Sequence, residues 1–275
     1  MMRAATLPLG GAAMSERRDQ RRLFALTRAV APSITACELT HLRRDPIDLA
    51  LANAQHRAYE EALAAAGCHV VRLPATPGLP DSVFVEDTAI VVDEVAIITR
   101  PGAESRRAET ASTAGGIAPY RTVVTMSAPA TLDGGDVLRI GNQLFVGASS
   151  RSNAEGVAQL EDAVRGFGYR VSCVPLRGCL HLKSAVTLVR PDVLLANPAW
   201  VDPALLGPLQ VIDVDPSEPF AANALLVGGR VIHPAAFERT RERLDRHGID
   251  VDAIDVSELA KAEGGVTCCS LVFEV

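Results

Sequence analysis

The chain has 275 residues, with 27 lysines and arginines against 33 aspartates and glutamates, so its formal net charge is −6. This mild acidic balance argues against nucleic acid or an anionic membrane as the main partner, and it is compatible with a cationic small molecule. No uninterrupted apolar run approaches the roughly 20 residues that a membrane-spanning helix needs.

The six cysteines contain no C-x-x-C pair, and their spacing is not that of a small disulfide framework. A chain of this length buries enough surface to form a core without disulfide bonds. We therefore expect free thiols and a reducing, cytoplasmic compartment. The cysteines are Cys37, Cys68, Cys173, Cys179, Cys268 and Cys269.

The first 20 residues are mostly small or apolar up to Met14, and Pro8 with the following Leu-Gly-Gly interrupts them before they reach signal-peptide length. We expect residues 1–20 to be a disordered leader, or translation to start at Met14. Residues 21–275 contain no linker or low-complexity tract, so we expect one catalytic domain there, acting as a monomer or a homodimer.

Helix-like segments recur along the chain, and the clearest of them end at a glycine. One starts at Asn153, which is a favourable N-cap, and the last opens with Pro234 at a first-turn position. In chain order the predicted helices are 53–66, 104–114, 153–167, a short and weak one at 201–207, and 234–247.

A short and largely apolar strand follows each helix-like segment, and the starts of these strands are roughly 40 to 52 residues apart. Strand–turn–strand patterns lie between the repeats, as at Gly141-Asn142, where a hairpin turn is expected. The unit is therefore ββαβ, and it recurs about five times. The predicted single strands are 69–74, 121–126, 169–175, 209–215 and 249–256, and the hairpins are 88–99, 137–146, 185–196 and 224–233.

Repeated units of this size, when they are arranged radially, protect their sheet edges around a common axis. We therefore predict an α/β propeller whose modules surround a central site. An ordinary layered α/β sandwich is the alternative.

The most informative stretch runs from Asp81 to Asp87, with the sequence DSVFVED, and reads as a buried strand. Because side chains of a strand alternate between its faces, Asp81 and Asp87 would share one face and Glu86 would lie on the other. Like charges on an apolar face are costly to bury unless a cation lies between them. The stretch indicates a pocket for a planar cation such as guanidinium, whose forked donors match carboxylates. The alternative is a frayed strand end with solvated acids.

Two later segments carry groups suited to acid–base chemistry. Asp133 and Asp136 lie in a glycine-rich approach to a strand, and His181 is flanked by Leu180 and Leu182. An acid that orients a histidine, and a histidine that serves a thiol, form a nucleophile–base–orienter set. Taken alone, His181 is more typical of a satisfied core histidine than of a catalytic one.

The C-terminal segment GGVTCCS places Cys268 and Cys269 just after a glycine pair, which lets the backbone approach something closely. One thiol can belong to the core while the other faces a pocket, and the alternative is that both are inert. Zinc held by these two cysteines and His181 is a further alternative. Adjacent cysteines do not easily ligate one tetrahedral ion, so zinc is expected at most as an inhibitor of the thiol.

Seven segments in order across residues 20–275 resemble those of the dimethylarginine dimethylaminohydrolases, in the guanidino-group-modifying (amidinotransferase) superfamily. Each segment is a weak signal alone, and seven in order are specific. The resemblance implies a five-bladed α/β propeller, in agreement with the repeat. The segments are LPDSVFVEDTA from Leu79, ITRPGAESRR from Ile98, LDGGDV from Leu132, RSNAEG from Arg151, LHLKS from Leu180, AAN from Ala221 and GVTCCS from Gly265.

By position, the resemblance implies that Cys268 is the nucleophile, His181 the general acid/base and Asp133 the acid that orients it. Some relatives have glutamate at the last position, so the geometry of the histidine can differ. The substrate-binding residues that the resemblance implies are Asp81, Glu86 and Asp87 around the guanidinium, Arg106 and Arg151 at the carboxylate end, and Leu39 and Ala262 through their backbone.

The implied activity is hydrolysis of Nω-methylated arginine, asymmetric dimethylarginine or monomethylarginine, to citrulline and a methylamine. It would pass through an S-alkylthiouronium on Cys268 and would need neither metal nor cofactor. An arginine deiminase, or a hydrolase of another N-substituted arginine, is an alternative within the same chemistry. A non-catalytic protein that binds guanidino compounds is the alternative from another class.

Overall fold

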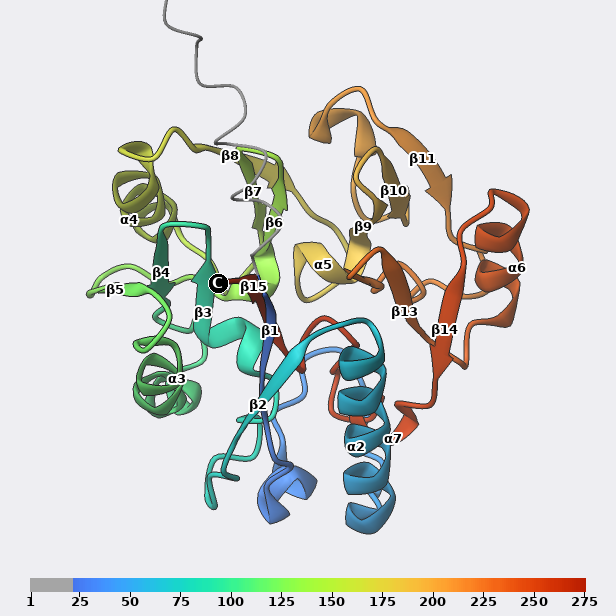
Figure 1. Ribbon diagram of the computed structural model, residues 1–275, viewed down its shortest axis with the longest axis horizontal. Coiled ribbons are helices and arrows are strands. Elements are labelled where there is room, and N and C mark those ends of the chain that lie inside the picture. Colours follow the sequence, from blue (N-terminus) through green and yellow to red (C-terminus); the bar gives the residue numbers. More distant parts are fainter. Residues whose placement is uncertain (1–21) are drawn as a thin grey trace, which may run out of the picture.

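The computed structural model describes residues 22–275. Its strands form five three-stranded sheets, which are arranged in a ring around a common centre (Figure 1). The expectations of a disordered leader and of a start at Met14 concern residues that lie outside the described part. None of the helices in residues 22–275 is both long enough and apolar enough to cross a membrane.

The five predicted single strands and the four predicted hairpins are confirmed, with ends that differ by a few residues. The strands are β1 (Leu23–Arg28), β2 (His69–Leu73), β3 (Ala89–Val91), β4 (Val95–Ile98), β5 (Thr122–Thr125), β6 (Val137–Ile140), β7 (Gln143–Ala148), β8 (Arg170–Pro175), β9 (Val186–Arg190), β10 (Val193–Ala196), β11 (Gln210–Asp213), β12 (Leu225–Val227), β13 (Arg230–Pro234), β14 (Val251–Ile254) and β15 (Leu271–Glu274). The α-helices and 3-10 helices (η) are η1 (Pro32–Ala36), α2 (Leu49–Ala65), η2 (Val85–Thr88), η3 (Glu104–Glu109), α3 (Thr110–Ile117), η4 (Gly134–Asp136), α4 (Ala154–Arg165), α5 (Leu182–Ala185), η5 (Pro203–Leu206), α6 (Glu238–Arg246) and α7 (Ser257–Ala260).

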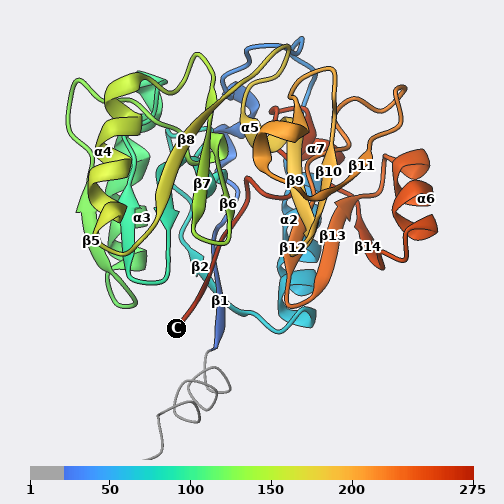
Figure 2. The same ribbon diagram turned by 90° about the horizontal axis from the view of Figure 1, so that it is seen from above.

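Each sheet has the same construction. Its middle strand pairs antiparallel with one neighbour and parallel with the other, as β4 does with β3 and β5. The crossover to the parallel strand carries a helix, and α2, α3, α4 and α6 lie at the outside of the ring (Figures 1 and 2). The ββαβ unit and the propeller are therefore confirmed, and the layered sandwich is contradicted.

The ring is closed by the two ends of the described chain. Strand β1 pairs parallel with β2 and antiparallel with β15, with Leu26 opposite Leu271. The backbones of Arg22 and Val275 extend the antiparallel pair with two further hydrogen bonds. Sequence analysis identified neither β1 nor its pairing, because this contact joins segments at opposite ends of the sequence.

Three predicted helix boundaries were wrong. Helix α2 starts at Leu49 because the side chain of Asp48 accepts hydrogen bonds from the amides of Ala50 and Leu51. Segment 104–114 begins as the 3-10 helix η3, and α3 continues through the glycine pair that was expected to end it. Pro234 is the last residue of β13, opposite Ile254, so α6 starts four residues later.

The sheets place the loops that build the site. Each module packs its helix on its own sheet, as α4 does with Leu160 and Val164 against Leu144, all fully buried. With the modules held from outside, the segments at the inner ends of the strands meet at the centre. These segments are 81–88, 133–136, 181–185 and 262–270.

Candidate active site

Segments from different modules surround a small pocket of about 30 Å³ near the centre of the ring, which we call the polar pocket. Glu86 and Leu39 lie outside its lining, although both were expected at the site. The expected residues that do line it are Asp81, Asp87, Arg106, Asp133, Arg151, His181, Ala262 and Cys268.

The acidic segment is not a strand, contrary to the expectation. It forms a turn, with the amide of Phe84 bonded to the carbonyl of Asp81 at 2.9 Å, and then η2. Local hydrogen bonds thus replace a strand ladder. The side chains still separate as expected, since Asp81 and Asp87 face the polar pocket and Glu86 does not. Asp87 is only 3% exposed, which contradicts solvated acids at a frayed end.

Glu86 has its own cation. Its carboxylate accepts hydrogen bonds from Nζ of Lys183 at 2.6 Å and from Oγ1 of Thr267 at 2.7 Å. Burial, the largest influence, still raises the pKa of Glu86. Sequence analysis gave Lys183 no role, although it follows His181 by two residues and a buried acid requires a compensating cation.

His181 joins two acids. Its Nε2 lies 3.0 Å from Oδ2 of Asp133, and its Nδ1 lies 3.8 Å from Oδ1 of Asp87. The other oxygen of Asp133 accepts a hydrogen bond from the amide of Gly102 at 2.8 Å. Burial opposes protonation of the imidazole, but the charge of Asp87 and the bond to Asp133 outweigh it and raise the pKa of His181 to about 9.

Asp87 is fixed from several sides. Oδ2 accepts a hydrogen bond from Nη1 of Arg106 at 2.5 Å, and Oδ1 accepts one from the amide of Gly135 at 3.0 Å. Burial opposes ionisation, but the charges of His181 and Arg106 outweigh it and lower the pKa of Asp87 to about 2. The carboxylate is therefore negative at neutral pH.

The two expected carboxylate-binding arginines differ in their surroundings. Arg106 is buried, and its guanidinium also donates to Glu109 and to the carbonyls of Asp81 and Phe84. It therefore holds several protein groups, although it also lines the polar pocket. Glu109 was missed, and its spacing of three residues from Arg106 was the available signal.

Arg151 is the more accessible of the two arginines. Its Nη2 donates to Oγ1 of Thr40 at 3.0 Å, and its Nη1 lies 3.8 Å from Oε2 of Glu38. Both partners are exposed, so Arg151 stands at the solvent side of the polar pocket. This position suits a fork that binds a ligand carboxylate.

The adjacent cysteines have different environments. Cys269 is 1% exposed and packs in the core, whereas Cys268 lines the polar pocket and accepts a hydrogen bond from the amide of Gly265 at 3.3 Å. Burial first, and then the charges of Glu86 and Asp87, raise the pKa of Cys268 to about 12. In the unliganded protein this thiol is neutral.

Glycines are required where the backbone meets the site. A Cβ at Gly135 would lie 2.7 Å from both Oδ1 of Asp87 and Nδ1 of His181, and one at Gly265 would lie 2.3 Å from Oδ1 of Asn223. The amide of Asn223 in turn bonds to the backbone and hydroxyl of Thr267, one residue before Cys268. The glycine-rich and AAN segments thus fix the turn that presents the thiol.

The two backbone-contact candidates lie on either side of Glu263. Ala262 lines the polar pocket, and Leu39 is partly buried against the core. Glu263 has a φ of 58° and accepts hydrogen bonds from the amides of Thr40, His41 and Leu42, so it holds the Leu39 loop beside the pocket.

Within residues 22–275, one set of three potential metal ligands approaches within 4.8 Å, namely Asp87, Asp133 and His181. The hydrogen bond between His181 and Asp133, the ion pair between His181 and Asp87, and the bonds of both acids to backbone amides account for this closeness. The set includes neither Cys268 nor Cys269, so it differs from the zinc site considered from the sequence.

No protein-family model matches the chain. N(G),N(G)-dimethylarginine dimethylaminohydrolase of Streptomyces coelicolor is 42% identical over 248 residues, which are 90% of this chain and 95% of that protein. The chain belongs to the dimethylarginine dimethylaminohydrolase family. The protein of the same name from Pseudomonas aeruginosa is 40% identical over 229 residues, which are 82% of this chain and 90% of its own length.

Solved structures of the family have the same fold. A cysteine-to-serine mutant from Pseudomonas aeruginosa, complexed with citrulline, matches with a TM-score of 0.85 at 36% identity and covers 91% of this chain and 98% of its own. The N-terminal domain of ArgZ, an arginine dihydrolase from cyanobacteria, has a TM-score of 0.81 at 20% identity, covers 91% of this chain and 97% of its own, and shares the fold. The predicted five-bladed architecture and the family resemblance are confirmed.

Replacement of Gly135 by alanine should move the imidazole of His181 away from Asp87, because the new methyl group has no space. We expect the pKa of His181 to fall from about 9 toward its ordinary range, measured by NMR titration. The control is Gly115→Ala, where a Cβ meets no atom within 4 Å. An unchanged pKa in a folded Gly135→Ala protein would contradict the described geometry. If that variant does not fold, Asp133→Asn removes the charge of the other acid beside His181 and should also lower the pKa.

Proposed function

We propose that this protein hydrolyses Nω-methylated arginines, asymmetric dimethylarginine and monomethylarginine, to citrulline and the corresponding methylamine. One observation carries the proposal: Cys268, an acid-bound His181 and the acids Asp81 and Asp87 line the same pocket. Two relatives that are 40–42% identical to the chain are named for this reaction.

Binding begins with charge. Asp87 is ionised, and with Asp81 it offers carboxylates to the N–H groups of a flat cation. We assign the substrate carboxylate to Arg151, at the solvent side, and give Arg106 the role of holding Asp87 in position. The backbone of Leu39 and Ala262 remains a proposed contact with the substrate.

The first half of the reaction forms a bond to sulfur. Carboxylates fix the plane of the guanidinium, and the thiolate of Cys268 attacks its central carbon. As the C–S bond forms, His181 gives its proton to the methylated nitrogen, the C–N bond breaks and the amine leaves. The product of this half is an S-alkylthiouronium on Cys268.

The second half restores the enzyme. Neutral His181 takes a proton from water, and the resulting hydroxide adds to the same carbon. The C–S bond then breaks, the proton of the added hydroxyl passes to the departing sulfur, and citrulline and the neutral thiol of the free protein are formed. Water supplies the oxygen of the product, and no metal or cofactor takes part in the proposed steps. Asp133 orients the imidazole in both halves.

Substrate binding also solves the problem of the neutral thiol. The negative charges of Glu86 and Asp87 add to the effect of burial and raise the pKa of Cys268. A bound guanidinium places a positive charge beside the same sulfur and favours the thiolate. The nucleophile would therefore form when the substrate is in place.

The rival functions have less support. A deiminase for unsubstituted arginine would use the same groups, and no feature of the pocket favours it. A binding protein has no need for the thiol and the oriented histidine.

We further propose that residues 21–275 act as one catalytic domain, as a monomer or homodimer, in the cytoplasm. The six free cysteines support a reducing compartment.

Replacement of Cys268 by serine should abolish citrulline formation, because a neutral hydroxyl is a poor nucleophile here. Mass spectrometry of wild-type protein quenched during turnover should show the substrate adduct on the Cys268 peptide. The control is Cys173→Ser, which removes an exposed free thiol and should retain activity. Turnover by Cys268→Ser would rule out the covalent route.

Replacement of Arg151 by alanine should weaken binding of asymmetric dimethylarginine about tenfold or more. A hydrogen bond to a charged group contributes roughly 1.5–3 kcal/mol, and its loss lowers the affinity by that factor. Methylguanidine lacks a carboxylate, so its affinity should change little. Calorimetry on the Cys268→Ser background measures both. The control is Arg107→Ala, since Arg107 lies outside the polar pocket. Equal losses for both ligands would refute the clamp.

Alkylation of Cys268 by iodoacetamide in the unliganded protein should accelerate with pH. The thiol has a pKa of about 12, so the thiolate fraction should rise about tenfold per pH unit between pH 7 and pH 10. Peptide mass spectrometry follows Cys268, with exposed Cys173 as a reference for the reagent. A plateau near neutral pH would show that the free protein already holds a thiolate.

A further inference from the structure

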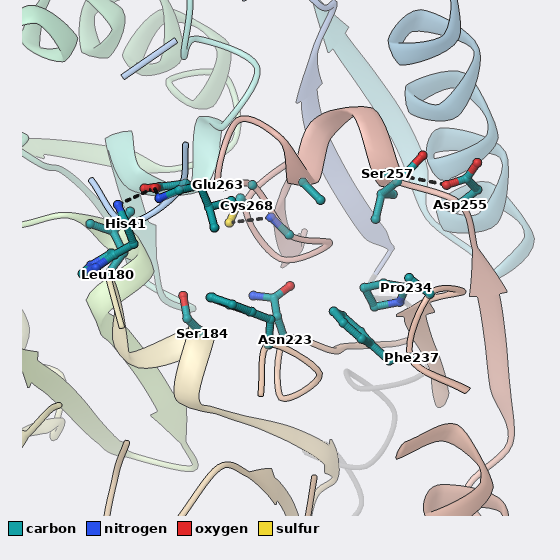
Figure 3. A pocket seen from close by; sticks show the side chains of 17 residues that line it. His41, Leu180, Ser184, Asn223, Pro234, Phe237, Asp255, Ser257, Glu263 and Cys268 are labelled. Carbon is teal, nitrogen blue, oxygen red and sulfur yellow. Dashed lines mark hydrogen bonds between the residues drawn. The ribbon is translucent and has the colours of Figure 1, made fainter. Parts of the chain in front are cut away.

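Cys268 borders a second pocket, which we call the apolar pocket. It has a volume of about 190 Å³ and shares Leu180, Glu263, Gly264 and Cys268 with the polar pocket. Figure 3 shows Leu180 toward one end, Pro234 and Phe237 toward the other, and Cys268 between them with Ser184 and Asn223. The thiol therefore stands between an acidic compartment and this larger one.

Three polar side chains on the wall of the apolar pocket are engaged within the protein. Asn223 bonds to Thr267, Asp255, which is exposed to solvent, accepts a hydrogen bond from the amide of Ser257, and Glu263 accepts hydrogen bonds from the Leu39 loop. The remaining surface is mainly aliphatic or aromatic, from Pro234, Ala236, Phe237, Val256 and Ala260. A neutral apolar group is the ligand chemistry that such a surface matches.

The rim of this pocket is apolar as well. Leu42 is 40% exposed and Phe220 is 44% exposed, and both belong to the pocket lining. They are among the few large hydrophobic side chains that residues 22–275 expose to this degree. Exposed apolar side chains around a concave site are typical of a binding surface.

Geometry decides which part of a substrate reaches this pocket. The reacting carbon must lie at the sulfur of Cys268, and the N–H groups of the guanidinium turn toward Asp81 and Asp87. The substituted nitrogen has fewer hydrogens to donate, and its carbon substituent gains nothing from a carboxylate. The substituent therefore turns away from the acids, and the apolar pocket is a space that also borders the thiol and whose lining contains neither Asp81 nor Asp87.

We propose that the apolar pocket is a subsite for the Nω substituent of the substrate, and that it accepts alkyl groups larger than methyl. Because a methyl group is about the size of a water molecule, with a share of liquid volume of about 30 Å³, two methyl groups leave most of the pocket unfilled. This inference rests on the proposed function and extends its substrate class to longer Nω-alkyl arginines. The reaction is unchanged: water adds, the C–N bond breaks, and citrulline and an alkylammonium form.

The test compares Nω-propyl-L-arginine with Nω-monomethyl-L-arginine on the full chain, with citrulline formation as the readout. We expect kcat/KM for the propyl compound to lie within about tenfold of the methyl value, because the apolar pocket has room for the two extra methylenes. A site without that room would lower the value by about tenfold or more for each methylene. The filling variant is Ala260→Phe. Ala260 is exposed, lines the apolar pocket and lies outside the polar one.

Ala260→Phe should lower kcat/KM for the propyl compound about tenfold or more and change the methyl value less than about threefold. The matched control is Ala64→Phe, an exposed alanine of α2 outside both pockets, which should leave both values unchanged. If Ala260→Phe does not fold, Ala236→Phe fills the same pocket from another segment.

The outcomes separate this inference from the proposed function. Turnover of the methyl compound without turnover of the propyl compound overturns the subsite and leaves the proposed function standing. Turnover of neither compound overturns the proposed function itself. Equal losses for both compounds in Ala260→Phe, or no loss for either, also overturn the subsite.

Discussion

The buried carboxylate of Asp87 must be compensated, because an unpaired charge at 3% exposure would be very costly. Its partners come from three separate segments: Arg106 from η3, Gly135 from η4 and His181 just before α5. The contact of each partner with Asp87 holds the segment of that partner at the centre of the ring. The same contacts that make burial of the acid tolerable therefore place the imidazole beside the thiol's pocket, so that stability and site geometry depend on one group.

In the unliganded site, the electrostatics favour a protonation state in which the thiol is unreactive. The imidazole is held in its charged form by acids, while the thiol is held in its neutral form by burial and by the charges of Glu86 and Asp87. In this state His181 can donate a proton, but Cys268 is not a thiolate and cannot act as the nucleophile. A cation of the right shape reverses only the second condition, so selection of the ligand and activation of the sulfur become one event.

Local patterns made the modules predictable. Glycines after helices, an Asn cap at Asn153 and a Gly-Asn turn act over a few residues, and they defined the ββαβ units. The pairing of β1 with β15 was not predictable in this way, because it joins distant segments. The acidic segment resembled a strand by its apolar residues, but turn hydrogen bonds determine its conformation. Cys268, His181 and Asp133 followed from residue type and resemblance. Lys183 and Glu109 were missed because their positions in the sequence are weak signals, and the folded chain shows which buried charges they compensate.

The closure of the ring by β1 and β15 has a consequence for biosynthesis. Domains begin to fold from the N-terminus while the ribosome is still adding residues, so β1 emerges first and its antiparallel partner emerges last. Throughout translation one edge of the first sheet lacks its neighbour, and such an edge is open to pairing with other chains. Cys268 lies in the turn that leads into β15. The nascent polypeptide therefore gains Cys268 and β15 almost together. The nucleophile is added to the chain at nearly the same time as the strand that closes the ring.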